Sequence, residues 1–262
     1  MPESVLVTGG TSGIGLETAR ELSRRGCIVY TLSRRGSQEP GMTHLLGDVT
    51  DEASVSAAVN QIVSERGALN VLVCCAGFGV SGAVEYTPLA DAKAQVDVNL
   101  FGTVNCCRMS LPALRKSRGR IVNISSVAAP VAIPFQAYYS VSKAGINAFS
   151  LALANEVRPF GITVCCVMPG DIKTGFTAAR KKDHTGDDIY GGRIARSVAV
   201  MERDEQNGMS AAAAGRYVAN RALKKRCPPL CTIGASYKLL VFLTRLLPVR
   251  LVNRLVYMLY AK

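Results

Sequence analysis

The stretch Val5-Leu6-Val7-Thr8-Gly9-Gly10-Thr11-Ser12-Gly13-Ile14-Gly15 passes from an apolar strand through a glycine-rich turn to the start of a helix. Glycine lets the backbone turn tightly and lets a phosphate approach it closely. The unpaired N–H groups and the positive dipole end of a helix N-terminus then favour a bound anion. The Gly-x-x-x-Gly-x-Gly spacing differs from the usual Gly-x-Gly-x-x-Gly fingerprint, and a plain glycine turn is the alternative. Its place after an apolar strand at the start of the chain predicts a dinucleotide site.

The rest of the chain alternates β-rich runs with helical stretches. Their continuous hydrophobicity suits strands that are covered on both faces, as in a parallel sheet. The runs are Val5–Thr8, Cys27–Leu32, Thr43–Leu46, Val71–Cys74, Arg120–Ile124, Thr163–Val167 and, more weakly, Leu230–Ile233. Helices are expected at 14–25, 51–66, about 88–117, 137–158 and 209–226. This order predicts an α/β fold with a single-domain, Rossmann-type, doubly wound parallel sheet of about seven strands.

Composition and charge exclude several classes of protein. A hydrophobic fraction of 48% and a charged fraction of 19% over 262 residues argue against a disordered chain. The net charge of +12 is concentrated at the C-terminus: ten basic and no acidic residues follow Glu205, which leaves +2 (21 basic minus 19 acidic) before it. These basic residues alternate with Leu and Val and carry no recognition motif, so we expect no nucleic-acid partner. Met1-Pro2-Glu3-Ser4 leads into a strand without a basic leader, which predicts a cytoplasmic protein.

The nine cysteines are expected to be reduced thiols. Three adjacent pairs occur, and neighbours in a strand point to opposite faces, so they are poorly placed to bond with each other. Cys227-Pro-Pro-Leu-Cys231 lacks the spacing of a zinc site, and the chain has only two histidines. We therefore expect no metal and no disulfide framework.

A tyrosine, a lysine and a serine form a candidate proton-transfer group. A phenol with a pKa of about 10 is a poor acid–base catalyst near neutral pH, and a nearby ammonium would lower that pKa. Tyr139 and Lys143 stand four residues apart and therefore share one face of a helix. Ser126 follows the run Arg120–Ile124 and is expected at that strand's carboxyl end, where its hydroxyl could hold a substrate oxygen.

The residues at the end of the second predicted strand indicate whether the cofactor is NAD(H) or NADP(H). An acidic residue there would bind the ribose hydroxyls of NAD, whereas arginine favours the 2′-phosphate of NADP. Ser33-Arg34-Arg35 contains no acid, so NADP(H) is favoured and NAD(H) is possible. The alternative is that both arginines are solvated surface charges.

With these residues in place, the chain resembles the short-chain dehydrogenase/reductase family over roughly residues 3–234. Thr8–Gly15 resembles the cofactor turn, Asp48-Val49 the pair at the adenine, and Pro169–Thr174 the stretch at the nicotinamide and pyrophosphate. The family's Asn-Asn-Ala-Gly reads Cys74-Cys75-Ala76-Gly77 here, which puts local rigidity of the sheet in question.

The resemblance implies hydride transfer between a nicotinamide and a carbinol or carbonyl carbon. Tyr139 would be the acid or base, Ser126 would polarise the oxygen, Lys143 would lower the tyrosine pKa and bind the ribose, and Asn99 would support a proton-relay water. The predicted catalytic residues are thus Asn99, Ser126, Tyr139 and Lys143. The predicted cofactor-binding residues are Gly9, Thr11, Ser12, Gly13, Ile14, Gly15, Ser33, Arg34, Arg35, Asp48, Val49, Ala76, Gly77, Asn99, Tyr139, Lys143, Pro169, Gly170, Ile172 and Thr174.

Residues 1–236 are assigned to the catalytic domain, with a long polar loop at 171–208 that predicts a substrate lid, or else a surface excursion. The apolar segment Ala128–Phe135, with Phe78, Val80 and Met168, predicts a lipophilic pocket or ordinary core. A hydroxysteroid or bile acid is the favoured substrate. Retinol, a fatty aldehyde or a 3-ketoacyl compound is the alternative substrate. The alternative to an enzyme is a non-catalytic sensor protein that binds NADP(H).

Residues 237–262 form a basic extension, in which Tyr237–Tyr260 predicts two short amphipathic helices divided by Pro248. Neither is long enough to cross a bilayer. The extension could lie on an anionic membrane, cover the substrate entrance or pack in an oligomer interface. It resembles the tails of membrane-associated steroid and retinol dehydrogenases, which favours peripheral membrane contact. A homodimer or homotetramer is also expected from the family.

Overall fold

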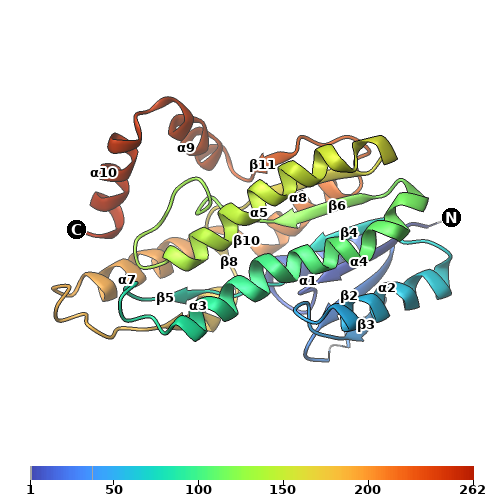
Figure 1. Ribbon diagram of the computed structural model, residues 1–262, viewed down its shortest axis with the longest axis horizontal. Helices are drawn as coiled ribbons and strands as arrows, with labels where there is room; N and C mark the ends of the chain where they lie inside the picture. Colours follow the sequence, from blue (N-terminus) through green and yellow to red (C-terminus); the bar gives the residue numbers. More distant parts are fainter. Residues whose placement is uncertain (1, 37) are drawn as a thin grey trace.

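The structure is a computed structural model that describes residues 2–36 and 38–262, and it is built on a seven-stranded parallel sheet (Figure 1). The strand order is β11-β7-β6-β4-β1-β2-β3, and every neighbouring pair is parallel. The strands are β1 (Ser4–Thr8), β2 (Ile28–Ser33), β3 (Met42–Leu46), β4 (Val71–Cys74), β6 (Arg120–Ile124), β7 (Thr163–Met168) and β11 (Leu230–Thr232). The predicted doubly wound α/β fold is confirmed. The chain order reverses between β1 and β4, which is where such sheets bind ligands.

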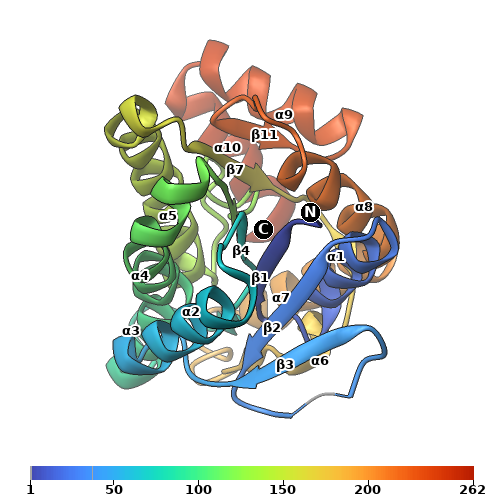
Figure 2. The ribbon, with the colours of Figure 1, turned by 90° about the vertical axis from the view of Figure 1, so that its right-hand side faces the viewer.

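Helices cover both faces of the sheet (Figure 2). One face packs against α1 (Gly13–Arg24) and α8 (Ala211–Ala222). The other packs against α2 (Glu52–Arg66), α4 (Gly102–Ser117) and α5 (Ala137–Glu156). Strand residues alternate between these two cores, as the pleat requires.

The helix expected over 88–117 is interrupted. It consists of α3 (Leu89–Val96), a π-helical turn (Asp97–Phe101) and α4. A Cβ on Gly102 would lie 2.6 Å from Val49, so glycine allows this segment to approach the loop after β3. Such π-turns are frequent at functional sites, and this one carries Asn99.

The segment 171–208 is more ordered than the predicted loop. It contains β8 (Ile172–Lys173), α6 (Phe176–Ala179), β9 (Lys181–Lys182) and α7 (Arg193–Gln206). β8, at the start of the segment, pairs with β10 (Met209–Ser210), just after its end, and β9 pairs with β5 (Val80–Ser81), which attaches the segment to the body partway along its length. The helix predicted from 209 therefore begins at Ala211, after β10.

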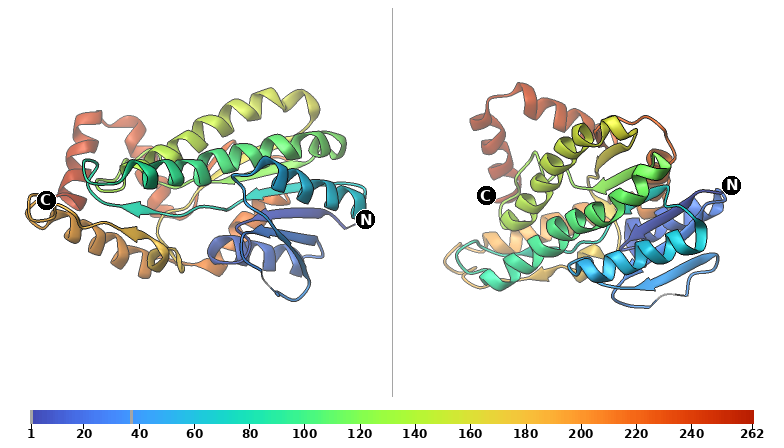
Figure 3. Two further views of the ribbon diagram at one scale, coloured as in Figure 1. Left: turned by 60° about the horizontal axis from the view of Figure 1, so that its bottom comes forward. Right: turned by 45° about the vertical axis from the view of Figure 1, so that its right-hand side comes forward.

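The C-terminal residues form two short helices, as predicted. α9 spans Ala235–Leu246 and α10 spans Val249–Tyr260, with Pro248 between them. Figure 3 shows this pair, in red, at the end of the molecule where α7 lies. Within residues 2–36 and 38–262, no helix is both long and apolar enough to cross a membrane.

All nine cysteines are free thiols. The predicted opposition of neighbours is observed for Cys74–Cys75 and Cys165–Cys166, whereas Cys106 and Cys107 lie in helix α4 and pack in one core. Cys165 packs in the core beneath α1 and α8, whereas the Cys166 thiol contacts Asn147 on α5. Cys74 replaces a buttressing asparagine of the family and packs in the core with Cys106 and Cys107. Burial and these neighbouring thiols raise the pKa of Cys74, so it behaves as a small apolar side chain.

Candidate active site

A cavity of about 450 Å³ lies at the carboxyl ends of β1, β4, β6 and β7. It is lined by the glycine turn, the loops after the three other strands, the first turns of α5, the segment 169–179 and α7. The predicted site residues on its wall are Gly9, Ser12, Gly13, Ile14, Gly15, Arg35, Ala76, Gly77, Ser126, Tyr139, Lys143, Pro169, Gly170, Ile172 and Thr174. The remaining six, Thr11, Ser33, Arg34, Asp48, Val49 and Asn99, lie outside this wall.

The glycine turn is packed too tightly for larger residues. A Cβ on Gly9 would lie 2.8 Å from the backbone of Ala76, and one on Gly15 would lie 2.3 Å from the carbonyl oxygen of Gly9. Gly13 has a φ of +52°, which disfavours other residues. The turn therefore brings the N-terminus of α1 directly to the cavity and forms a backbone cradle suited to a diphosphate.

The far end of this cradle carries hydroxyl and guanidinium groups. The Thr11 and Ser33 hydroxyls are 3.3 Å apart, and the Ser33 hydroxyl donates to the carbonyl of Arg35. Both Arg34 and Arg35 are exposed, and Arg35 lines the cavity. Asp48 accepts hydrogen bonds from the Thr50 backbone and hydroxyl and so shapes the loop after β3.

Tyr139 and Lys143 lie one turn apart on α5, beside Ser126. Burial raises the pKa of Tyr139 to about 12, although the Ser126 hydroxyl and the charge of Arg180 act to lower it. The Lys143 ammonium lies 5.6 Å from the centre of the Tyr139 ring and donates to the carbonyl of Ile124 at 2.9 Å. Burial lowers the pKa of Lys143 to about 8. Burial therefore keeps Tyr139 a neutral phenol, and the expected lowering of its pKa by Lys143 stays a prediction.

Asn99 does not line the cavity itself but forms hydrogen bonds with Phe78, which does. Its side chain accepts from the backbone N–H of Phe78 at 2.9 Å and donates to the carbonyl of Phe78 at 3.0 Å and to the Ser142 hydroxyl at 3.1 Å. It therefore joins the loop after β4 to α5. A Cβ on Gly77 would lie 3.0 Å from the Asn99 amide oxygen and 3.8 Å from the Lys143 nitrogen, so a larger residue there would press on the Asn99 side chain.

Several cavity residues were not predicted. Phe176, Met201, Glu205 and Tyr260 line the side opposite the glycine turn, together with Asp171. Of the apolar residues predicted there, Phe78, Ala128 and Ile133 line the cavity, whereas Val80 and Met168 belong to the core. Pocket lining and ordinary core were the two alternatives predicted for these apolar residues, and both are found among them.

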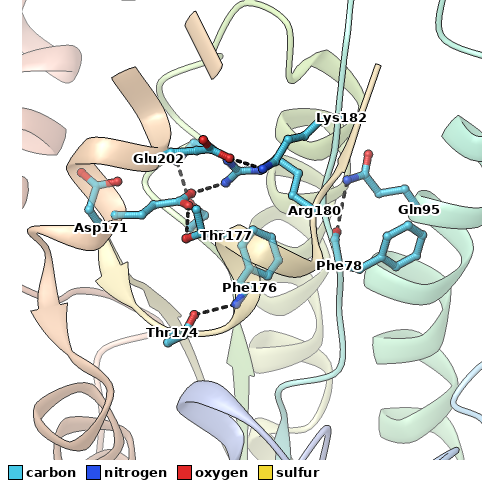
Figure 4. Close-up of polar contacts among 12 residues, drawn as sticks. Phe78, Gln95, Asp171, Thr174, Phe176, Thr177, Arg180, Lys182 and Glu202 are labelled. Carbon is cyan, nitrogen blue, oxygen red and sulfur yellow. Dashed lines mark hydrogen bonds and ion pairs between the residues drawn. The ribbon is translucent and has the colours of Figure 1, made fainter. Parts of the chain in front are cut away.

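The unpredicted side of the cavity contains a buried polar group (Figure 4). Glu205 accepts from the Thr177 hydroxyl at 2.5 Å and pairs with Arg180, which is 4% exposed. Asp171 accepts from the Tyr237 hydroxyl, and burial raises its pKa. The Phe176 ring lies 5.8 Å from the Tyr139 ring, and both residues line the cavity. This wall thus combines apolar surface with two carboxylates.

The sequence matches that of known proteins over most of its length. The sequence model of the family described as short chain dehydrogenase matches residues 3–185. The 3-ketodihydrosphingosine reductase of Bacteroides thetaiotaomicron is 41% identical over 243 residues, which cover 91% of this chain and 90% of that protein. The 17-beta-hydroxysteroid dehydrogenase type 6 of Rattus norvegicus is 36% identical over 186 residues, covering 67% of this chain and 58% of that protein.

A solved structure has the same fold. The crystal structure of a short-chain dehydrogenase from Streptomyces avermitilis superposes with a TM-score of 0.81 and 26% identity, over 92% of this chain and 91% of that one. The chain therefore belongs to the short-chain dehydrogenase/reductase family, and it is an oxidoreductase of the kind that binds NAD(P)(H).

Proposed function

We propose that this enzyme reduces the ketone of a long-chain amino ketone with NADPH. The observation that supports the proposal is the cavity itself, because Ser126, Tyr139 and Lys143 line the same cavity as the glycine cradle. The bound cofactor supplies the hydride. The chain's own residues must then hold the carbonyl, deliver one proton to its oxygen and exclude water.

The protonation states suit reduction. Burial keeps Tyr139 a neutral phenol, which is the form that donates a proton. As the carbonyl carbon gains a hydride, its oxygen accepts a hydrogen bond from Ser126 and takes the proton of Tyr139. The Lys143 ammonium, one helical turn away, then stabilises the phenolate that is left, until solvent returns the proton.

Asn99 serves this step as a positioning residue. Its amide is fully engaged with Phe78 and Ser142, so it holds the loop that forms one wall against the helix that carries Tyr139. The water-holding role implied by the resemblance stays a prediction.

The cofactor is proposed to be NADP(H). Arg35 lies on the cavity wall beyond the Thr11 and Ser33 hydroxyls, and an arginine there provides a charge-assisted partner for a 2′-phosphate. Titration of the enzyme's bound-nucleotide fluorescence with NADPH and NADH tests this. NADPH should bind at least tenfold more tightly, and equal affinity would refute the preference.

The wall of the cavity supports the choice of substrate. Phe176, Met201 and Ile133 provide apolar surface for an alkyl chain, while Asp171 and Glu205 provide carboxylates for an ammonium group. Arg180 already neutralises Glu205, which leaves Asp171 as the carboxylate without a cationic partner among the described residues. A long-chain amino ketone carries both features, as the name of the Bacteroides relative implies.

The hydroxysteroid prediction remains a second candidate, because a relative with that activity in its name matches two thirds of this chain. NADPH oxidation followed at 340 nm with 3-ketodihydrosphingosine, a 17-ketosteroid, retinal and a 3-ketoacyl thioester separates the candidates. The amino ketone should give the highest kcat/KM. A higher value for the steroid would overturn the substrate assignment and leave the reaction class intact.

The expected homo-oligomer also stays a proposal. Phe101, Val141 and Leu151 are exposed apolar residues on or beside α5, which gives this helix a surface for self-association. Sedimentation velocity of the full chain would measure the oligomeric state, and a monomer at micromolar concentration would contradict the proposal.

A further inference from the structure

The C-terminal hairpin, defined as residues 235–260, exposes most of the large apolar side chains on the surface. Among the described residues, nineteen large hydrophobic side chains are exposed, and eleven of them lie in this hairpin. They are Leu239, Leu240, Phe242, Leu243, Leu246, Val249, Leu251, Leu255, Tyr257, Met258 and Leu259. α9 buries only Val241 and α10 buries only Val256. Patches of this kind mark a surface that binds something apolar.

The same surface is strongly and uniformly positive. Lys238, Arg245, Arg250, Arg254 and Lys262 are exposed, and no acidic residue follows Glu205 in the chain. None of the five forms an ion pair with any of the residues that the structure describes. A second copy of the hairpin would bring the same charges together and be repelled. An anionic bilayer satisfies both the apolar and the cationic side chains.

Both ends of the hairpin are held at the cavity. Tyr237, in the first turn of α9, donates to Asp171, and its ring occupies the space where a Cβ on Gly170 would lie. Tyr260, at the end of α10, lines the cavity, and burial raises its pKa to about 12. The connection between α9 and α10 stands away from the sheet (Figures 1 and 3). The hairpin thus joins the apolar surface to the cavity wall.

We infer that the C-terminal hairpin docks on the surface of an anionic lipid bilayer, with its apolar side chains among the headgroups and its basic side chains on lipid phosphates. Because Tyr237 and Tyr260 hold its ends at the cavity, docking brings the cavity close to the bilayer. The further consequence, that a lipophilic ketone enters from the bilayer, rests on the proposed function.

Flotation of the full-length protein with vesicles tests the docking without substrate or cofactor. Wild type should float with phosphatidylcholine vesicles that contain 30% phosphatidylglycerol, should bind pure phosphatidylcholine at least tenfold more weakly, and should lose part of its binding in 0.5 M NaCl. Arg250→Glu combined with Arg254→Glu should lower the partition coefficient roughly 30-fold or more, since each basic residue near an anionic surface contributes about 1 kcal/mol. Phe242→Ser combined with Leu246→Ser should lower it roughly 100-fold.

Matched variants elsewhere on the surface provide the controls. Lys93→Glu with Lys116→Glu changes the charge equally, and Leu46→Ser with Leu89→Ser removes equally exposed apolar side chains. Both controls should float like wild type, with circular dichroism confirming that every variant is folded.

Three outcomes would overturn the inference: equal flotation on neutral and anionic vesicles, no flotation at all, or equal losses in hairpin and control variants. Self-association that Phe242→Ser with Leu246→Ser abolishes, without any vesicle binding, would assign the hairpin to a second copy instead. Tyr139→Phe should still float like wild type, so failure of the reaction and failure of the docking are distinguishable.

Discussion

The pH dependence of reduction follows from the burial of Lys143. Lys143 is 6% exposed, its amine donates to a backbone carbonyl, and burial lowers its pKa from 10.5 to about 8. Since the folded pKa is lowered, the ammonium is present below about pH 8 and is lost above it. Tyr139 has a pKa of about 12 and stays protonated throughout this range. Of these two groups, only Lys143 therefore titrates between pH 7 and pH 10.

The size of the effect can be worked out from these values. With a pKa of about 8, the charged fraction of Lys143 falls from about 90% at pH 7 to about 1% at pH 10. If the ammonium stabilises the phenolate, kcat/KM for ketone reduction should fall by nearly tenfold per pH unit above pH 9, and by about 90-fold between pH 7 and pH 10. An unperturbed lysine would still be about three-quarters charged at pH 10 and would lose almost nothing.

The assay is kcat/KM for NADPH oxidation, measured from pH 6 to pH 10, because this parameter reports the groups of the free enzyme. Lys143→Arg keeps a cation at all these pH values. Its kcat/KM should be lower than that of wild type but should no longer fall at high pH. Cys75→Ser is the control, because burial raises the pKa of this cavity thiol to about 12 and its loss should leave the profile unchanged. A wild-type profile that stays flat to pH 10, or a fall at high pH that survives in Lys143→Arg, would refute the assignment.

Three further predictions test the cradle, the cofactor and the substrate. Gly15→Ala should destabilise the fold by about 1–3 kcal/mol, because its Cβ would lie 2.3 Å from the Gly9 carbonyl oxygen, whereas Gly175→Ala has open space and should not; thermal melting compares them. Arg35→Ala should weaken NADPH binding by roughly tenfold or more and leave NADH binding unchanged, and equal losses for both nucleotides would contradict a contact with the 2′-phosphate. Asp171→Asn should lower kcat/KM roughly tenfold or more for an amino ketone and leave a ketone of equal chain length without the amine unaffected; a uniform loss would mean that the carboxylate is structural.

The sequence predicted the sheet well because continuous apolar runs and glycine turns are local signals. All seven predicted runs became strands of the main sheet, with ends that differ by at most one residue. α7 was missed because its many charged residues resemble a loop. Its buried residues Ile194, Ser197, Val198 and Met201 nevertheless recur with helical spacing, and that signal could have revealed it.

The candidate site was predictable only in part, and for a physical reason. The glycine turn, Ser126, Tyr139 and Lys143 were found because each belongs to a short motif at a strand end or on one helix face. Glu205 and Tyr260 reach the cavity from α7 and α10, so their positions depend on how distant elements pack. The raised pKa of Tyr139 was likewise not foreseen, since it follows from burial, which depends on how distant elements pack.

The central claim is that Tyr139 delivers the proton during NADPH-dependent reduction of an amino ketone. Tyr139→Phe tests it directly, because the change removes one hydroxyl and keeps the ring against Phe176. Single-turnover oxidation of bound NADPH should slow by about 10²- to 10⁴-fold while NADPH affinity stays within twofold of wild type. Turnover close to that of wild type in this variant, with NADPH still bound, would contradict the account.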